Sequence, residues 1–255
     1  MPNRRPTTRA VACFLLLVLA LLGAACRTDV DVLIKVKPGG AGTVTVTADL
    51  DAAAAAAVGD PSNLSFTDLT AAGWKLTNPA AHAGGLRVVA VRTFASADQL
   101  PAVLDEVGGT NGVFSATSLS LTDGFASSST AFRTKLRLSG DLGQFSDDQL
   151  TELLGGLALA RTPEDLAASG ADAADAATLT VRVVLPGGVD GGNGKLVKGV
   201  SSWSAPLSGG TATDQQLVAT GTEQQTGSLV LLGVGAALVV AAIVLVVVGL
   251  VRRGD

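Results

Sequence analysis

The chain has few of the residues that build catalytic and metal sites. Its 255 residues include two cysteines, one histidine, one methionine and no tyrosine. Both cysteines, Cys13 and Cys26, lie near the start, so the rest of the chain has no pair from which to form a disulfide. Histidine is the commonest general acid or base and a frequent zinc ligand. We therefore expect no catalytic residues, no metal site and no cofactor, and a fold held together by packing.

Basic residues are also scarce in the middle of the chain. Of the 18 Lys and Arg residues, five lie in the terminal segments, and one of the 22 acidic residues is Asp255. The remaining 13 basic and 21 acidic residues give the central segment a net charge of −8. Domains that bind nucleic acid are usually basic, because they neutralise phosphates. The central segment is therefore expected to have no nucleic-acid partner.

The first 25 residues have the composition of a secretory signal peptide. Three arginines precede an apolar stretch, and Gly23, Ala24 and Ala25 lead to Cys26. This end resembles a lipobox, although Gly23 stands where an aliphatic residue is usual. A thiol at this position accepts a diacylglyceryl group, and two or more acyl chains hold a protein firmly at a bilayer. The sequence predicts export and lipidation at Cys26; an ordinary signal peptide or an uncleaved signal anchor is the alternative.

The other end carries an uncharged apolar run of 24 residues at 228–251. A helix of this length crosses about 30 Å of hydrocarbon. Arg252 and Arg253 follow directly, and positive residues favour the cytoplasmic side. We therefore expect a single-pass protein of the cell membrane, with a cytoplasmic tail at 252–255 and its main domain outside the cytoplasm.

Several central segments alternate apolar and polar residues with a period of two, which is typical of half-buried strands. Segments 30–36 and 44–50 flank the Pro38-Gly39-Gly40 turn and predict a hairpin. The glycine-rich stretch 187–195 lacks the spacing of a phosphate-binding loop and predicts a tight turn. Further strands are expected at 86–94, 119–121, 132–138, 179–185, 196–203 and 216–219.

Helix-like patterns lie between these strands, and in the segment 96–107 the apolar residues fall on one face. We therefore expect an α+β fold, with a mainly antiparallel sheet and helices packed on one of its faces. The folded domain is expected to span 26–207. A polar segment rich in Gly, Thr and Gln then predicts a juxtamembrane linker at 208–227. The expected helices are 52–58, 62–72, 96–107 and 146–154.

Six basic residues share the non-core phase of the predicted strands. If these strands are neighbours, the residues form one basic face on an acidic domain. Such a face suits the anionic head groups of phospholipids or phosphoinositol glycolipids. The alternative is an ordinary solvated face with cross-strand ion pairs. The six residues are Lys35, Lys37, Arg133, Lys135, Arg137 and Arg182.

Taken together, these features resemble the LppM-type family of actinobacterial lipoproteins. The resemblance lies in the signal ending at Cys26, the strand at 30–36, Gly42 opening the next strand, Asn193-Gly194 before the strand that ends at Trp203, and the final apolar run with its arginines. It implies a compact α/β domain outside the cytoplasm, with relatives associated with envelope lipid or glycolipid binding. It supplies no catalytic residues.

Two hypotheses for function follow from the sequence. The first is a non-enzymatic, membrane-anchored envelope module that binds lipid or glycolipid. The second is a protein-interaction or scaffolding module, which presents an exposed sheet edge to another envelope protein.

Overall fold

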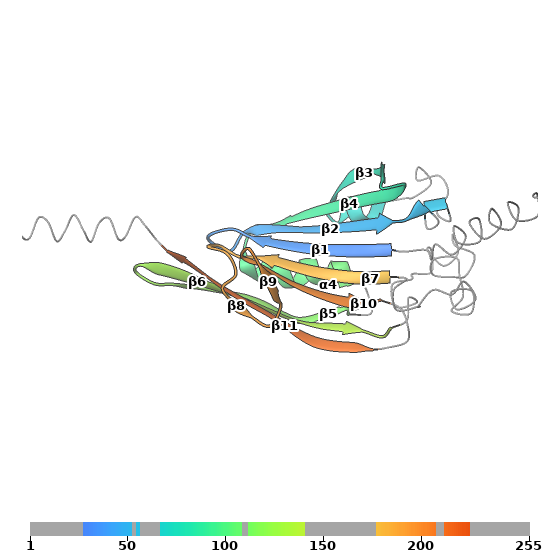
Figure 1. The fold of residues 1–255 in the computed structure, drawn as a ribbon. Helices are drawn as coiled ribbons and strands as arrows, with labels where there is room; N and C mark the ends of the chain where they lie inside the picture. Colours follow the sequence, from blue (N-terminus) through green and yellow to red (C-terminus); the bar gives the residue numbers. More distant parts are fainter. Residues whose placement is uncertain are drawn as a thin grey trace, which may run out of the picture.

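The computed structural model describes residues 28–52, 55–56, 67–108, 112–140, 177–207 and 212–224. Within these ranges the chain forms two β-sheets and a few short helices (Figure 1). Segments that lie far apart in the sequence meet in both sheets.

The larger sheet has seven strands in the order β3-β4-β2-β1-β7-β10-β9. β1 pairs with β2 as the predicted antiparallel hairpin, in which Val36 lies opposite Gly42. On its other side β1 runs parallel to β7, so this sheet is mixed. Its strands are β1 (Thr28–Val36), β2 (Gly42–Leu50), β3 (Lys75–His82), β4 (Gly85–Phe94), β7 (Ala177–Val184), β9 (Lys195–Val197) and β10 (Val200–Pro206).

The smaller sheet has four strands in the order β5-β6-β11-β8. β5 and β6 form a hairpin, and β11 pairs with β6 over its whole length, from Thr213 opposite Leu138 to Gln224 opposite Ser127. The glycine-rich stretch 187–195 contains a turn at Gly187, the short strand β8 and the start of β9, where the sequence predicted a single tight turn. The bounds are β5 (Phe114–Asp123), β6 (Ser127–Leu138), β8 (Gly191–Gly192) and β11 (Thr213–Gln224).

The two sheets share one hydrophobic core. Strands such as β6, β7 and β10 place alternate side chains on the core side, as the period of two requires. The helix α4 (Leu100–Gly108), which follows the 3-10 turn η2 (Ala97–Gln99), packs beside β5 and adds its apolar face to the core. The fully buried large side chains include Ile34, Val44, Leu100, Leu104, Phe114, Phe132, Leu136 and Leu217.

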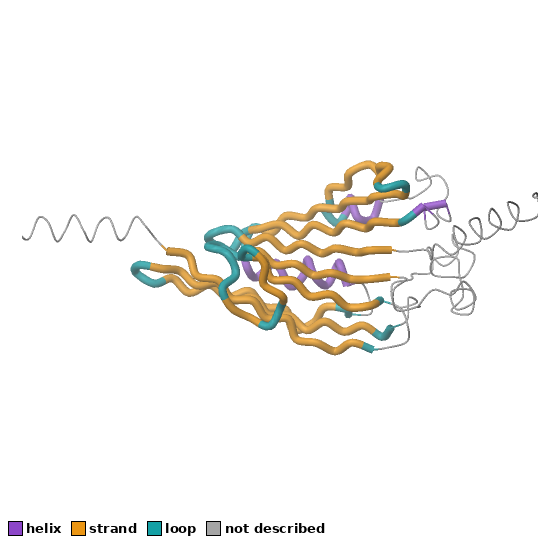
Figure 2. Tube along the Cα trace, in the orientation of Figure 1, coloured by secondary structure: helices purple, strands orange, loops and turns teal. Residues whose placement is uncertain are grey.

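The expected α+β fold with helices covering one face of the sheet is wrong. Strands dominate the described residues (Figure 2), and a second sheet meets the core face of the first. Two α-helices have described bounds, α3 (Thr67–Ala71) within the expected helix 62–72 and α4 overlapping the expected helix 96–107. Residues 52, 55 and 56, in the expected helix 52–58, are helical as well. Alternation predicts that a segment is a strand with one buried face, but it does not predict to which sheet the strand belongs. The predicted helix 146–154 lies outside the described residues.

The expected linker at 208–227 is also corrected. Most of it forms β11, a twelve-residue strand inside the smaller sheet. Leu217 and Ala219 of β11 are fully buried. Polar residues at the alternate positions of β11 face away from the core, so its average composition looks like that of a tether. The folded part of the chain therefore extends to Gln224.

Residues 1–27 and 225–255 lie outside the described residues. The signal peptide, the lipidation of Cys26 and the transmembrane helix at 228–251 therefore stay predictions from the sequence. No helix within the described ranges is both long and apolar enough to cross a membrane.

Candidate functional site: a basic row on β6

The structure divides the six predicted basic residues between the two sheets. Arg133, Lys135 and Arg137 lie on β6, in the smaller sheet, while Lys35 and Arg182 belong to β1 and β7 of the larger sheet. Lys37 follows β1 in the turn to β2. All five strand residues occupy the side of their sheet that faces away from the core, as predicted. A single basic face made by neighbouring strands is therefore wrong.

Three of the predicted residues remain together, and we call Arg133, Lys135 and Arg137 the β6 row. They alternate with the buried Thr134 and Leu136, which fixes all three on the outward side of β6. Residues two apart on a strand are separated by about 6.6 Å, so the row spans about 13 Å. The sequence alone predicted this row, because its members belong to one strand.

Asp214 is the only acidic residue paired with the row among the described residues. It lies opposite Arg137 on β11, with its Oδ2 atom 3.0 Å from Lys135 Nζ and 3.7 Å from Arg137 Nε. Arg133 is exposed and faces Ser118 on one side and Val218 on the other. Within the row itself, three cations therefore meet one carboxylate. Asp190 lies beside β11, where it accepts a hydrogen bond from Thr220.

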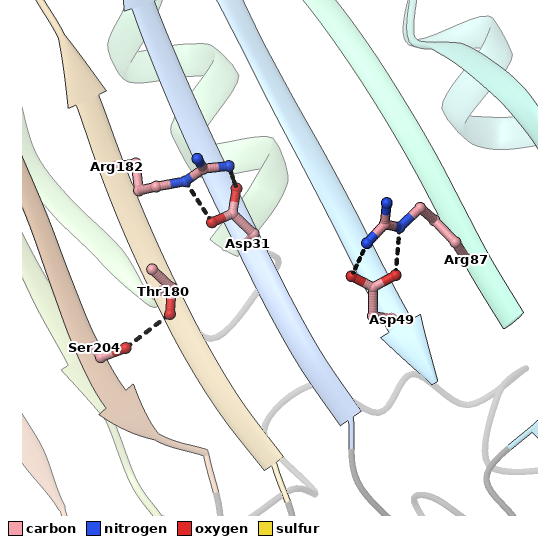
Figure 3. Close-up of polar contacts among 6 residues, drawn as sticks. All are labelled: Asp31, Asp49, Arg87, Thr180, Arg182 and Ser204. Carbon is pink, nitrogen blue, oxygen red and sulfur yellow. Dashed lines mark hydrogen bonds and ion pairs between the residues drawn. The ribbon is translucent and has the colours of Figure 1, made fainter. Parts of the chain in front are cut away.

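The outward face of the larger sheet has a different electrostatic pattern. Arg182 of β7 donates two hydrogen bonds to Asp31 of β1, at 2.7 and 2.6 Å (Figure 3). Arg87 of β4 makes a similar two-bond contact with Asp49 of β2. Each of these two arginines thus pairs with its own carboxylate. Arg182 therefore has no unpaired charge for the predicted binding of an anionic head group.

These pairs alter the acid–base properties of their members. The hydrogen bond from Arg87 holds the pKa of Asp49 below its ordinary value, since the carboxylate is the form that accepts it. The bonds to Asp49 and Asp31 raise the pKa of Arg87 and of Arg182. The two pairs join β1 to β7 and β2 to β4.

Lys35 and Lys37 are exposed and have no ion pair among the described residues. Lys35 lies opposite Thr43 on β2 and Val184 on β7. They stand near the β1–β2 turn on the larger sheet and therefore do not extend the β6 row. The structure shows two isolated lysines where the sequence predicted part of a continuous face.

Asn193 is an important residue that the sequence analysis treated only as part of a turn. Its Oδ1 atom accepts hydrogen bonds from Trp203 Nε1 of β10, at 3.1 Å, and from the Val218 backbone N–H of β11, at 2.9 Å. Its Nδ2 atom donates to the Gln216 carbonyl at 2.6 Å. One side chain therefore joins the two sheets. Long-range partners such as these leave no local signal in the sequence.

The outer strands of both sheets have features that oppose pairing with another protein. β3 contains Pro79 and a register shift between Thr77 and Ala80, and β5 has a shift between Ser115 and Ser118. The other two, β8 and β9, have two and three residues. Proline, bulges and short edge strands are common protections against edge-to-edge association. These four strands themselves thus give no support to a scaffolding role by strand addition, whereas β8 pairs with only Ala219 and Thr220 of β11.

Charged clusters elsewhere in the described ranges are not arranged like a metal site. No group of three or more His, Cys, Asp or Glu side chains in these ranges is arranged to hold a metal ion. Glu106 of α4 accepts a hydrogen bond from Trp74 Nε1 at 2.9 Å and lies 3.1 Å from Arg92 Nη1. This contact holds α4 against the larger sheet, which is a structural role.

Comparisons with known proteins yield one structural likeness. No protein-family model matches the sequence, and no curated protein does. The fold is similar to the folded domain of Mycobacterium tuberculosis LppM, determined by NMR, with 14% sequence identity and a TM-score of 0.43. The match covers 80% of this chain and 94% of that domain. It agrees with the LppM-type resemblance noted in the sequence, and at this level of similarity it transfers no property of that protein to this chain.

Proposed function

We propose that this chain is a membrane-anchored protein of the cell envelope, whose exported domain binds an anionic lipid or glycolipid head group without catalysing a reaction. The binding site is the β6 row. The observation that carries this proposal is the excess of positive charge there: three cations face one carboxylate, in a domain that is acidic as a whole.

The surroundings of the row suit a phosphate-bearing ligand. Ser118 of β5 and Gln216 of β11 are exposed beside it and offer hydrogen-bond donors. Arginine binds phosphate oxygens through two parallel N–H groups, and Arg133 has no competing ion pair among the described residues. A flat sheet face with spaced cations matches a head group better than it matches a buried small molecule.

The placement at a membrane rests on the sequence of the two ends. A signal peptide that finishes at Cys26 supports export with lipidation, and the apolar run at 228–251 followed by two arginines supports an anchor whose C-terminus is cytoplasmic. Both features put the β6 row on the side of the membrane where envelope lipids and glycolipids present their head groups.

Vesicle flotation of a chain comprising residues 27–224 tests this function. We expect it to float with phosphatidylcholine vesicles that contain phosphatidylinositol, and to remain unbound when only phosphatidylcholine is present. Each basic residue near an anionic surface contributes about 1 kcal/mol, so replacing all three residues of the row with serine should weaken binding about a hundredfold. Addition of soluble glycerophosphoinositol distinguishes recognition of the head group from recognition of a charged surface, since only the former is competed.

Lys75→Glu is the matched control, because Lys75 is an exposed cation on β3, in the larger sheet. It reverses one charge and leaves the β6 row intact. Arg133→Glu should therefore reduce binding much more than Lys75→Glu. Equal effects would assign the binding to overall charge, and an absence of any anionic preference in the parent chain would reject the proposed function.

A further inference from the structure

The hairpin of β5 and β6 ends in an exposed phenylalanine. Phe125 is 68% exposed, more than the other exposed large hydrophobic side chains of the described residues, Leu69, Leu196 and Val197. Phe94, Phe114 and Phe132 are at most 3% exposed. The fold therefore buries its other described phenylalanines and leaves this one in solvent.

The geometry of the turn does not require a large apolar residue. The Gly124 backbone N–H donates to the Ser127 carbonyl at 2.8 Å, and this bond closes a turn with Phe125 and Ala126 at its centre. Two-residue turns favour Asn, Asp and Gly, because these residues adopt the tight backbone conformations easily. Neither local conformation nor core packing thus explains the phenylalanine.

The tip of this hairpin lies where the described chain ends. Gln224, the last residue of β11, is opposite Ser127 in the register of the smaller sheet, and Figure 1 shows the two ends side by side. The uncharged run at 228–251 begins after three more residues. Three residues span at most about 11 Å, so an anchored run would keep the tip close to the bilayer.

We propose that the hairpin tip, residues 124–126, docks into the interfacial layer of the bilayer that holds the run at 228–251. This inference rests on the membrane anchoring proposed above, but not on ligand binding by the β6 row. Phenylalanine side chains insert at the boundary between head groups and acyl chains when an apolar surface lies on a membrane. The nearest charged residues on the adjoining strand ends, Asp123 and Glu223, are acidic, so the contact is apolar and independent of anionic lipid.

Tryptophan fluorescence tests the docking in the full chain. The chain with Phe125→Trp is reconstituted in phosphatidylcholine vesicles, with or without bromine atoms on the acyl chains. Trp74 and Trp203 are 4% and 5% exposed and give the same background in every variant. Leu69→Trp is the matched control, since Leu69 is also an exposed apolar residue, on α3, which contacts the edge strand β3 of the larger sheet. Unchanged thermal unfolding shows that each variant folds.

We expect the brominated lipid to quench the indole introduced at position 125 and to leave the one introduced at position 69 unquenched. A protein that is recovered with the vesicles while both indoles stay unquenched would overturn the docking and leave the anchoring intact. Emission that shifts to the blue with protein concentration and without quenching would also overturn it, because a second copy of the chain then covers the tip. Failure to recover the protein with vesicles would overturn both the docking and the anchoring.

Discussion

At the scale of single residues, the number of cations per carboxylate distinguishes the β6 row from the ion pairs of the larger sheet. Arg87 and Arg182 each meet one carboxylate on a neighbouring strand. On β6, Lys135 and Arg137 share Asp214, and Arg133 has no ion pair among the described residues. Exposed pairs contribute little to stability, typically below about 1 kcal/mol. Folding therefore does not depend on the excess of cations on β6, which remains available for the binding proposed above.

Asn193 should matter to stability more than its place in an exposed turn suggests. Asn193→Ala removes three hydrogen bonds and leaves the N–H of the buried Trp203 without a partner, so we expect a loss of about 2–4 kcal/mol in the free energy of unfolding. Asn193→Asp keeps the acceptor for Trp203 but places an oxygen against the Gln216 carbonyl, and should also destabilise. Urea unfolding followed by tryptophan emission measures both changes; a loss below about 0.5 kcal/mol for the alanine variant would show that water replaces the side chain.

The Arg87–Asp49 pair should make part of the unfolding free energy depend on pH. Because the pKa of Asp49 is lowered in the folded chain, its contribution is present above the ordinary value of 3.8 and is lost as the pH falls through the lower folded value. Arg87→Met removes this contribution at neutral pH. We therefore expect the difference in unfolding free energy between the parent and Arg87→Met to be largest at pH 7 and to shrink below about pH 4.

Urea unfolding at pH 7 and at pH 3 measures that difference. Lys75→Met is the control, because Lys75 has no ion pair in the described part of the chain. The difference between the parent and this control should not depend on pH to the same extent. A constant difference for Arg87→Met would mean that the pair contributes nothing to folding.

At the scale of elements, alternation predicted which residues are buried but not how the strands are arranged. The inward residues of β1, β2, β6 and β7 are those that the sequence indicated, including Val32, Val44 and Phe132. The parallel pairing of β1 with β7, and the division of strands between two sheets, depend on contacts between distant segments. Local composition carries no record of such contacts, so the basic residues of different strands were wrongly placed on one face.

β11 shows how composition can hide most of a strand, because the sequence predicted only its segment 216–219 and took the surrounding residues as a linker. If it is part of the core, Leu217→Ala should cost about 2–5 kcal/mol of unfolding free energy, because Leu217 is fully buried. Its neighbour Val218 points outward, so Val218→Ala should cost less than about 1 kcal/mol. Chemical unfolding of the two variants measures this contrast. Small and equal effects would show that this segment is a tether and not part of the core.

At the scale of the whole molecule, the proposed sites constrain how the domain sits on a membrane. Arg133 is eight residues from Phe125 along the hairpin, which corresponds to about 26 Å of extended strand. A domain that stands on its hairpin tip therefore holds the β6 row above the lipid surface, within reach only of groups that project from that surface. A domain that lies flat brings the row to the phosphates of ordinary phospholipids. Residues 27–224 without the anchors are free to adopt either orientation.

The clearest test of the account compares Asp214→Asn with Arg133→Glu in the chain of residues 27–224, titrated with vesicles that contain phosphatidylinositol. Asp214→Asn removes the one carboxylate paired with the row, and with it the ion pairs to Lys135 at 3.0 Å and to Arg137 at 3.7 Å. The account predicts that Asp214→Asn tightens binding and that Arg133→Glu weakens it. Unchanged or weaker binding by Asp214→Asn, together with unchanged binding by Arg133→Glu, would show that the row is an ordinary solvated sheet face.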